Sequence, residues 1–303
     1  MADYLVYLLS CVYTMVSMLV SVAFFIVLER KGLGVFQLRH GPNKVGVKGL
    51  VQAVADGVKL LSKSLTAPSK ANKVLFFLAP VLLFSVSFCI WAVFPSWYPT
   101  FYFNFSVFFF LSVSASNVFG LILSGWSSNS VYAMLGAMRA VAQTISYEVC
   151  MTTLLLCPLL FFYTFEFQHV CEVGIKSGFF CFEVFLLWFI SVLAETNRAP
   201  FDFVEGESEL VAGYHVEMGG AFFALIALGE YGSMLAMSVF TVALFFSGLS
   251  SVLSMLLIVS FSMLFILVRA AVPRYRYDVL MDFCWKVALP LSLSLFVVCL
   301  ALS

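Results

Sequence analysis

Five carboxylates stand close together in the segment ETNRAPFDFVEGESEL (residues 195–210), and only Arg198 opposes them, which leaves a local charge of −4. Two like charges 4 Å apart repel by about 1 kcal/mol in water and by about 4 kcal/mol at an effective dielectric of 20. Crowded carboxylates therefore bind protons more readily and titrate as a group. Apolar residues between these acids favour a folded wall over a free, solvated loop, which is the alternative. We expect this segment to take up or release protons when a charge appears nearby. The acids are Glu195, Asp202, Glu205, Glu207 and Glu209.

Three further acids, Glu148, Glu183 and Glu230, lie inside long apolar stretches. A charged side chain at the centre of a bilayer costs at least about 2.5 kcal/mol, so each needs a reason to be there. Glu183 falls in the first turn of its stretch and is expected to reach interfacial water. For Glu148 and Glu230 we favour a role in proton transfer; the alternative is that they are buried, hydrogen-bonded acids. Gly229 and Gly232 are expected to allow either close packing of another helix beside Glu230 or a local bend.

The sequence gives little support for a metal, haem or nucleotide site. The eight cysteines form no CxxC pair, and the three histidines (His40, His169 and His215) fall in connecting segments, so axial haem ligands inside a span are missing. There is no phosphate-binding glycine loop. We expect the chain alone to bind no metal, haem, NADH, iron–sulfur cluster or nucleic acid.

The composition places these residues in a membrane. Apolar residues make up 63% of the 303 residues, charged residues only 11%, and the mean hydropathy is +1.06. A soluble domain carries about 25% charged residues. With about 20 apolar residues needed for each crossing, we predict an all-α, polytopic membrane protein, one integral-membrane domain over 1–303. The eight predicted spans are 4–28, 74–94, 104–124, 145–165, 179–194, 220–246, 251–268 and 287–302.

The distribution of basic residues indicates on which side of the membrane each connecting segment lies. The alternate loops 29–73, 125–144, 195–219 and 269–286 hold 15 of the 16 Lys and Arg residues, and only Lys176 falls elsewhere. The positive-inside rule places these four loops on the cytoplasm-equivalent side and both termini on the other side.

The first of these loops contains a predicted amphipathic helix, GLVQAVADGVKLLSK (residues 49–63). Its apolar residues recur at helical spacing, and Gln52, Asp56, Lys59 and Lys63 occupy the opposite face. We expect this helix to lie in the membrane interface, either as a surface anchor or as a helix that also seals a ligand tunnel.

Four stretches of the chain resemble the NADH dehydrogenase subunit 1 family, the quinone-channel membrane subunit of respiratory complex I. They are LERKGLGVFQLRHGPNKVG (28–46), GWSSNSVYAMLGAMRAVAQTISYEV (125–149), LAETNRAPFDFVEGESELVAGYHVE (193–217) and RAAVPRYRYDVLMDFCWK (269–286). The resemblance runs over the whole chain and implies eight transmembrane helices. It also implies that quinone enters from the membrane beside the amphipathic helix and is reduced at a site completed by peripheral-arm subunits.

The resemblance assigns roles to individual positions. Residues that resemble the family's quinone channel are Arg30, Gln37, Arg39, Asp56, Arg139, Arg198, Asp202, Arg274 and Arg276. Residues that resemble its proton-coupling acids are Glu148, Glu195, Asp202, Glu205, Glu207, Glu209 and Glu230. The substrate implied is ubiquinone or rhodoquinone. NADH, FMN and iron–sulfur clusters would be bound by partner subunits, next to small membrane subunits and lipid, in the mitochondrial inner membrane.

Other readings of the sequence stay open at this stage. The equivalent subunit of a membrane-bound hydrogenase-type complex would share these motifs but not the quinone. A secondary proton-coupled transporter would also place acids inside spans, although such carriers often show an internal repeat, which this chain lacks. A haem-containing quinol oxidoreductase is disfavoured because no predicted span contains histidine.

Overall fold

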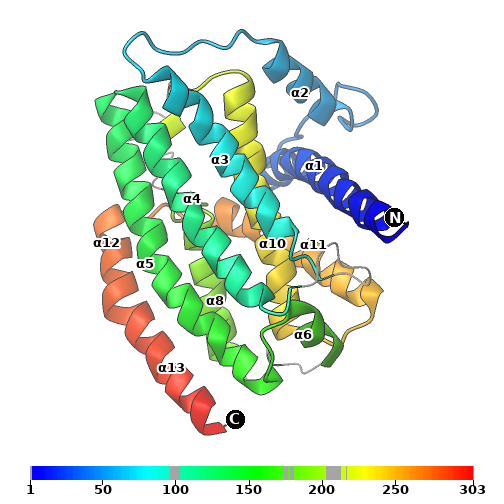
Figure 1. Cartoon of the computed structure of the whole chain (residues 1–303). Coiled ribbons are helices and arrows are strands. Elements are labelled where there is room, and N and C mark those ends of the chain that lie inside the picture. The colour runs from blue at the N-terminus through cyan, green and yellow to red at the C-terminus, as the bar shows by residue number, and fades with distance from the viewer. Residues whose placement is uncertain are drawn as a thin grey trace.

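The computed structural model describes residues 2–95, 103–173, 177, 181–202, 213–215 and 217–302, and within these ranges every regular element is a helix (Figure 1). This confirms the all-α prediction. The elements are α1 (Ala2–Phe36), α2 (Gln52–Ser62), α3 (Lys73–Trp91), α4 (Ser106–Ser128), α5 (Val131–Phe162), α6 (Phe167–Val173), α8 (Phe182–Glu195), the short 3₁₀ helix η1 (Gly213–His215), α10 (Ala221–Phe245), α11 (Ser251–Ala271), α12 (Tyr277–Phe283), the π-helical η2 (Cys284–Ala288) and α13 (Leu289–Leu302).

In the described part of the chain, seven helices are long and apolar enough to cross a membrane. They are α1, α3, α4, α5, α10, α11 and the continuous helix from α12 through η2 to α13. Each overlaps one of the predicted spans, although α5 and the last helix begin 14 and 10 residues earlier than predicted. The remaining predicted span, 179–194, corresponds to α8, which has 14 residues. At 1.5 Å per residue this helix is about 21 Å long, shorter than the hydrocarbon core of about 30 Å.

Two of the predicted loops are largely helical, which corrects the sequence analysis. In the predicted loop 125–144, α4 continues to Ser128 and α5 begins at Val131, so the connection is the turn at Asn129 and Ser130. In the predicted loop 269–286, α11 continues to Ala271 and α12 begins at Tyr277. Charged residues marked these segments as loops, but a helix that projects beyond the lipid can carry charge. With 32 residues, α5 is about 48 Å long and projects in this way.

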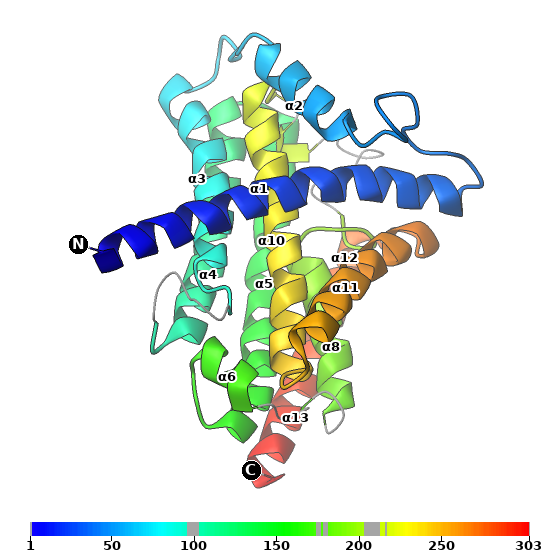
Figure 2. The ribbon, with the colours of Figure 1, turned by 90° about the vertical axis from the view of Figure 1, so that its right-hand side faces the viewer.

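The centre of the molecule is a bundle of α3, α4, α5 and α10, in which α3 packs against both α4 and α10 (Figure 1). On its other side α5 packs against α8 and α13. Figure 2 shows α1 crossing this bundle at a steep angle, beside α10 and α11, with α2 above it. Glycines let the helices approach: a Cβ at Gly232 of α10 would lie 2.4 Å from Met18 of α1, and one at Gly229 would lie 3.3 Å from the Leu83 carbonyl of α3. The predicted close packing around Glu230 is therefore confirmed.

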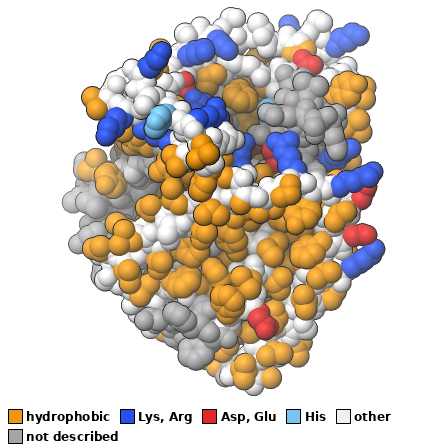
Figure 3. Space-filling view, turned by 180° about the vertical axis from the view of Figure 1, so that it is seen from behind, with side chains coloured by type: hydrophobic (Ala, Val, Ile, Leu, Met, Phe, Trp, Pro, Cys, Tyr) orange, Lys and Arg blue, Asp and Glu red, His pale blue; other side chains and the backbone are white. Residues whose placement is uncertain are grey.

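Aromatic side chains fill the interior of the bundle. Trp188 of α8, Tyr147 of α5 and Phe240 of α10 are fully buried, with the Phe240 ring 4.7 Å from that of Phe110. The surface is sorted by charge: in the view of Figure 3, Lys and Arg side chains gather in the upper part, and hydrophobic side chains cover most of the rest. The charged end is the end that carries α2, and there the acidic segment 195–202 enters the interior.

Candidate functional site

The acidic segment turns into the protein directly after α8. The Asn197 N–H donates to the Ala194 carbonyl at 3.3 Å, and the Arg198 N–H donates to the Leu193 carbonyl at 3.3 Å. Asn197 has φ of 51°, in the left-handed region that asparagine tolerates better than most residues. This tight turn places Glu195, Arg198 and Asp202 in the interior, with exposed fractions of 7%, 8% and 5%. Burial contradicts the alternative of a solvated loop for these three residues.

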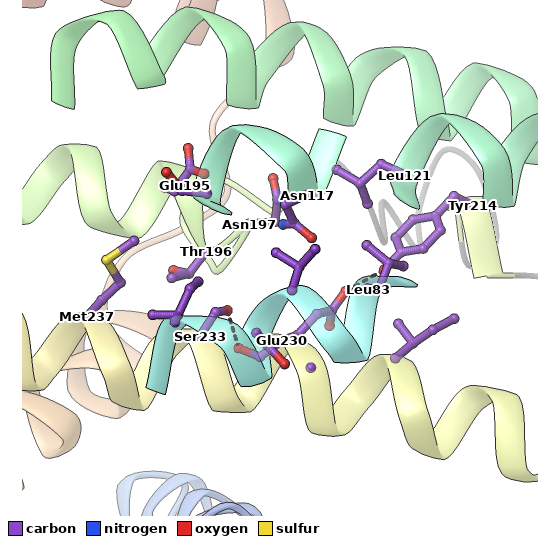
Figure 4. A pocket seen from close by; sticks show the side chains of 16 residues that line it. Leu83, Asn117, Leu121, Glu195, Thr196, Asn197, Tyr214, Glu230, Ser233 and Met237 are labelled. Atoms are coloured by element: carbon purple, nitrogen blue, oxygen red, sulfur yellow. Dashed lines mark hydrogen bonds between the residues drawn. The ribbon is translucent and has the colours of Figure 1, made fainter. Parts of the chain in front are cut away.

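A polar cavity of about 40 Å³ lies between this turn and helices α3, α4 and α10. Two of the predicted coupling acids, Glu195 and Glu230, line it, and Figure 4 shows Asn117 and Asn197 between them. At 10–15 Å³ for each molecule, the cavity has room for about three waters. The polar lining is completed by Ser87, Ser114, Thr196, Tyr214 and Ser233. Two carboxyl groups from different elements, Glu195 and Glu230, therefore lie on the wall of one small cavity.

Glu230 is held by a residue that the sequence analysis did not single out. The hydroxyl of Tyr214 donates to Oε1 of Glu230 at 2.6 Å. Tyr214 is fully buried in η1, which approaches α5 closely because a glycine stands opposite it. A Cβ at Gly136 would lie 3.0 Å from the backbone of Gly213 and of Tyr214. The resemblance covered Tyr214, but its role depends on a contact that the chain pattern does not reveal.

Glu195 is the last residue of α8, outside the seven spans, and the Glu148 carboxyl of α5 is near enough to act on it electrostatically. Burial raises the pKa of the Glu195 carboxyl to about 8, and repulsion from Glu148 adds to the effect. Glu195 thus shares the cavity with Glu230 and interacts electrostatically with Glu148. Glu183, by contrast, is exposed, as predicted for an interfacial residue.

A second charged cluster joins α1, α10 and α11 to the acidic segment. Arg269 of α11 forms an ion pair with Glu29 of α1, which is buried with an exposed fraction of 5%. The guanidinium of Arg198 lies over the ring of Tyr231, 4.0 Å from its centroid. The hydroxyl of Tyr231 interacts with both Glu29 and Arg198. Glu29, Tyr231 and Arg269 were not predicted as site residues, although Glu29 opens the ERK sequence at the inner end of the first span.

Some of the predicted channel residues meet in the structure and others do not. Asp202 is buried and accepts a hydrogen bond from Nη2 of Arg274 at 3.2 Å, so these two residues are brought together. Arg276 instead pairs with Asp278 at 3.2 Å, with side chains 80% and 72% exposed. Arg139 lies apart, 6.0 Å from the ring centroid of Tyr277.

The amphipathic helix α2 turns its polar face towards the protein. Nη1 of Arg30 lies 2.5 Å from Oδ2 of Asp56, and Nε2 of Gln52 donates to Oδ1 of Asp56 at 2.8 Å. Beyond α1, Nε of Arg39 donates to Gln37 at 2.9 Å, and both side chains are exposed. The apolar residues of α2, such as Val54 and Leu61, are exposed on the other face. Asp56 therefore holds the Arg30 guanidinium and the Gln52 amide on the same side of α2.

Three of the predicted coupling acids, Glu205, Glu207 and Glu209, lie outside the described residues. The candidate acids that the structure does describe are Asp202 and Glu195 in the acidic segment, and Glu148 and Glu230 in the bundle helices. The fold and the site together define a class: a polytopic helical membrane protein with a charged end and carboxyl groups in its interior.

Comparison with known proteins narrows this class to a family. The profile of the NADH dehydrogenase family matches residues 9–300. The chain is 46% identical over 298 residues to the NADH-ubiquinone oxidoreductase chain 1 of Heterololigo bleekeri, covering 96% of this chain and 95% of that one. It is 44% identical to the proteins of the same name from Aedes aegypti (96% of this chain, 94% of that one) and Patiria pectinifera (97% and 94%). The chain belongs to the NADH dehydrogenase subunit 1 family.

Proposed function

We propose that this chain is the subunit of proton-translocating NADH:ubiquinone oxidoreductase that forms the quinone-access channel and links quinone reduction to proton pumping. The names of the relatives support the quinone reading over the hydrogenase-type alternative. The observation that carries the coupling role is the polar cavity shared by Glu195 and Glu230. Catalysis requires the other complex I subunits, and the isolated chain has no activity of its own.

The channel is proposed to run past the charged residues at the inner ends of α1, α2 and α11. Arg30 with Asp56 and Arg274 with Asp202 would line its path, beside the cluster of Glu29, Arg269 and Arg198. Quinone would enter from the inner mitochondrial membrane, and peripheral-arm subunits would complete the headgroup site. Those subunits would also hold FMN, NADH and the iron–sulfur clusters.

Coupling follows from the chemistry of quinone reduction. The headgroup gains two electrons and then two protons, so a negative charge appears and disappears beside the acidic segment. In a low-dielectric interior that charge changes the free energy of each nearby carboxylate. Burial raises the pKa of the Glu195 carboxyl above its ordinary value, so a charge nearby would act on a carboxyl that already favours its protonated form. The cavity would then pass the proton towards Glu230.

The test is Glu230→Gln in the assembled enzyme. Glutamine keeps an acceptor for Tyr214 at nearly the same position, but it cannot carry a proton. We expect normal electron flow from NADH to a soluble artificial acceptor, with quinone turnover and proton pumping reduced together. Glu183→Gln, which changes an exposed acid, is the matched control. Full quinone turnover with an unchanged proton-to-electron ratio in Glu230→Gln would assign Glu230 to helix packing.

The sequence also predicts a role for the acids at 205–209. In assembled enzyme, Glu205→Gln or Glu207→Gln should leave the reaction with the artificial acceptor normal, while quinone turnover and the proton gradient fall together. A transporter function would predict instead that the purified chain moves protons by itself in vesicles.

A further inference from the structure

Gln143 of α5 joins the two ends of the acidic turn. Its Nε2 donates one hydrogen bond to the carbonyl of Ala194 at 2.8 Å and a second to the carbonyl of Phe201 at 3.0 Å. The side chain is fully buried. Because both partners are backbone carbonyls, which only accept, the amide has a single useful orientation. Reversing it would place its oxygen against two other oxygens.

The two carbonyls belong to residues that are seven positions apart in the chain. Between them stand Glu195 and Arg198, and Asp202 follows immediately. One carboxamide therefore closes the turn from the α5 side. From the other side, the N–H of Tyr275 donates to the carbonyl of Pro200 at 3.2 Å, in the connection that also supplies Arg274 to Asp202.

We infer that Gln143 is a positioning residue for quinone-linked proton transfer, because its amide fixes the distance and direction between Glu195 and the Asp202–Arg274 pair. It touches no reacting group and acts only through the backbone of residues 194–201. Without it, two buried carbonyls lose a donor and the turn is free to shift. The acids at its two ends then no longer keep a common geometry. This inference rests on the proposed function of the 195–202 segment.

The experiment compares four forms of the assembled enzyme. Gln143→Met keeps an unbranched side chain of similar length without a donor. Gln143→Glu has a donor only while its carboxyl is protonated, because the ionised form would face two carbonyl oxygens. Thr144→Val is the control in the next position, where a side chain that is 1% exposed donates to the Val141 carbonyl of its own helix at 3.1 Å. Wild type completes the set.

We expect quinone turnover in Gln143→Met to fall about tenfold, the loss anticipated from one to two unmade hydrogen bonds to buried carbonyls. The reaction with a soluble artificial acceptor and the behaviour of Thr144→Val should match wild type. In Gln143→Glu, quinone turnover relative to wild type should recover as pH falls and the carboxyl gains its proton. A side chain needed only for packing would give no such pH-dependent recovery.

Three results would overturn the inference: wild-type quinone kinetics in Gln143→Met, equal loss in Gln143→Glu at every pH, or failure of both variants to assemble while Thr144→Val assembles. The last assigns Gln143 to folding. If Gln143→Met alone fails to assemble, the pH profile of Gln143→Glu decides the matter. The proposed function fails separately, because it depends on Glu230→Gln and not on these variants.

Discussion

At the scale of single residues, burial decides which charges of this chain can take part in chemistry. Glu29, Glu195, Arg198 and Asp202 are all buried, and each has a charged or aromatic group nearby. Arg276 carries the same charge as Arg198 but pairs with Asp278 at the surface. Surface pairs contribute little, because water screens them. The buried set is therefore where substitutions should have the larger effects.

Asp56→Leu is expected to lower quinone turnover about fivefold, the effect of losing roughly 1 kcal/mol from one charge-assisted contact. The variant removes the acceptor that holds both Arg30 and Gln52. Steady-state kinetics with quinone and with a soluble artificial acceptor measure it. The control is Asp282→Leu, since Asp282 is 66% exposed and pairs only with Lys286 in the next helical turn. Unchanged turnover and apparent quinone affinity would make Asp56 a solvated surface residue.

Glu195 predicts a pH dependence of stability. Its folded pKa of about 8 lies above the ordinary value of 4.5. The folded state therefore binds the proton more tightly than the unfolded state, and stability is lost as pH rises between these values. Glu195→Gln removes this term. The melting temperature of the variant relative to wild type should rise between about pH 5 and about pH 8. A constant difference across that range would show that the carboxyl is not held protonated.

At the scale of elements, helices that project beyond the lipid build the site. The inner part of α5 carries Gly136, Gln143 and Glu148, all within a segment predicted as a loop or as the start of a span. The polar face of α2 contacts Arg30 near the end of α1 through Asp56, so α2 is held against α1 by a charged contact. The site is therefore built where long helices leave the membrane, because charged groups are tolerated there.

Gly136→Ala tests the approach of η1 to α5. Its methyl group would lie 3.0 Å from backbone atoms of Gly213 and Tyr214, so η1 must move and the Tyr214–Glu230 hydrogen bond should weaken. Overpacking of this kind costs about 1–3 kcal/mol. We expect a lower melting temperature and reduced quinone turnover. Gly57→Ala is the matched control, because nothing lies within 4 Å of its Cβ position. Equal behaviour of the two variants would contradict the prediction.

At the scale of the whole molecule, topology depends on whether α8 completes an eighth crossing. With eight crossings both termini lie on one side, and with the seven long helices alone they lie on opposite sides. The distribution of basic residues, 15 of 16 in alternate segments, favours eight.

We therefore expect tags at both termini to be cleaved by protease added to mitoplasts, because both would face the intermembrane space. An antibody against the segment between α2 and α3 should find it protected until the inner membrane is opened. Protection of one terminus together with cleavage of the other would reject the eight-crossing topology.

Composition and local pattern alone determined that this is an all-helical membrane protein and where seven spans lie, and they marked the acids near 195 and 230 as candidates for function. These are properties of neighbouring residues, because crossing a bilayer requires a continuous apolar run and an interior acid stands out within it. The limits of α5 and α12 were not predictable in this way, since a helix can leave the lipid without changing its backbone.

Only the tertiary structure shows which side chains form hydrogen bonds and ion pairs with one another. Glu29 meets Arg269 across 240 positions of sequence, Tyr214 reaches Glu230 from another element, and Gln143 bonds carbonyls 51 and 58 positions away. A side chain's hydrogen-bond partner depends on which helix packs against it and on how the two helices are positioned along their axes. That arrangement is set by packing among many helices at once, and no local pattern carries it.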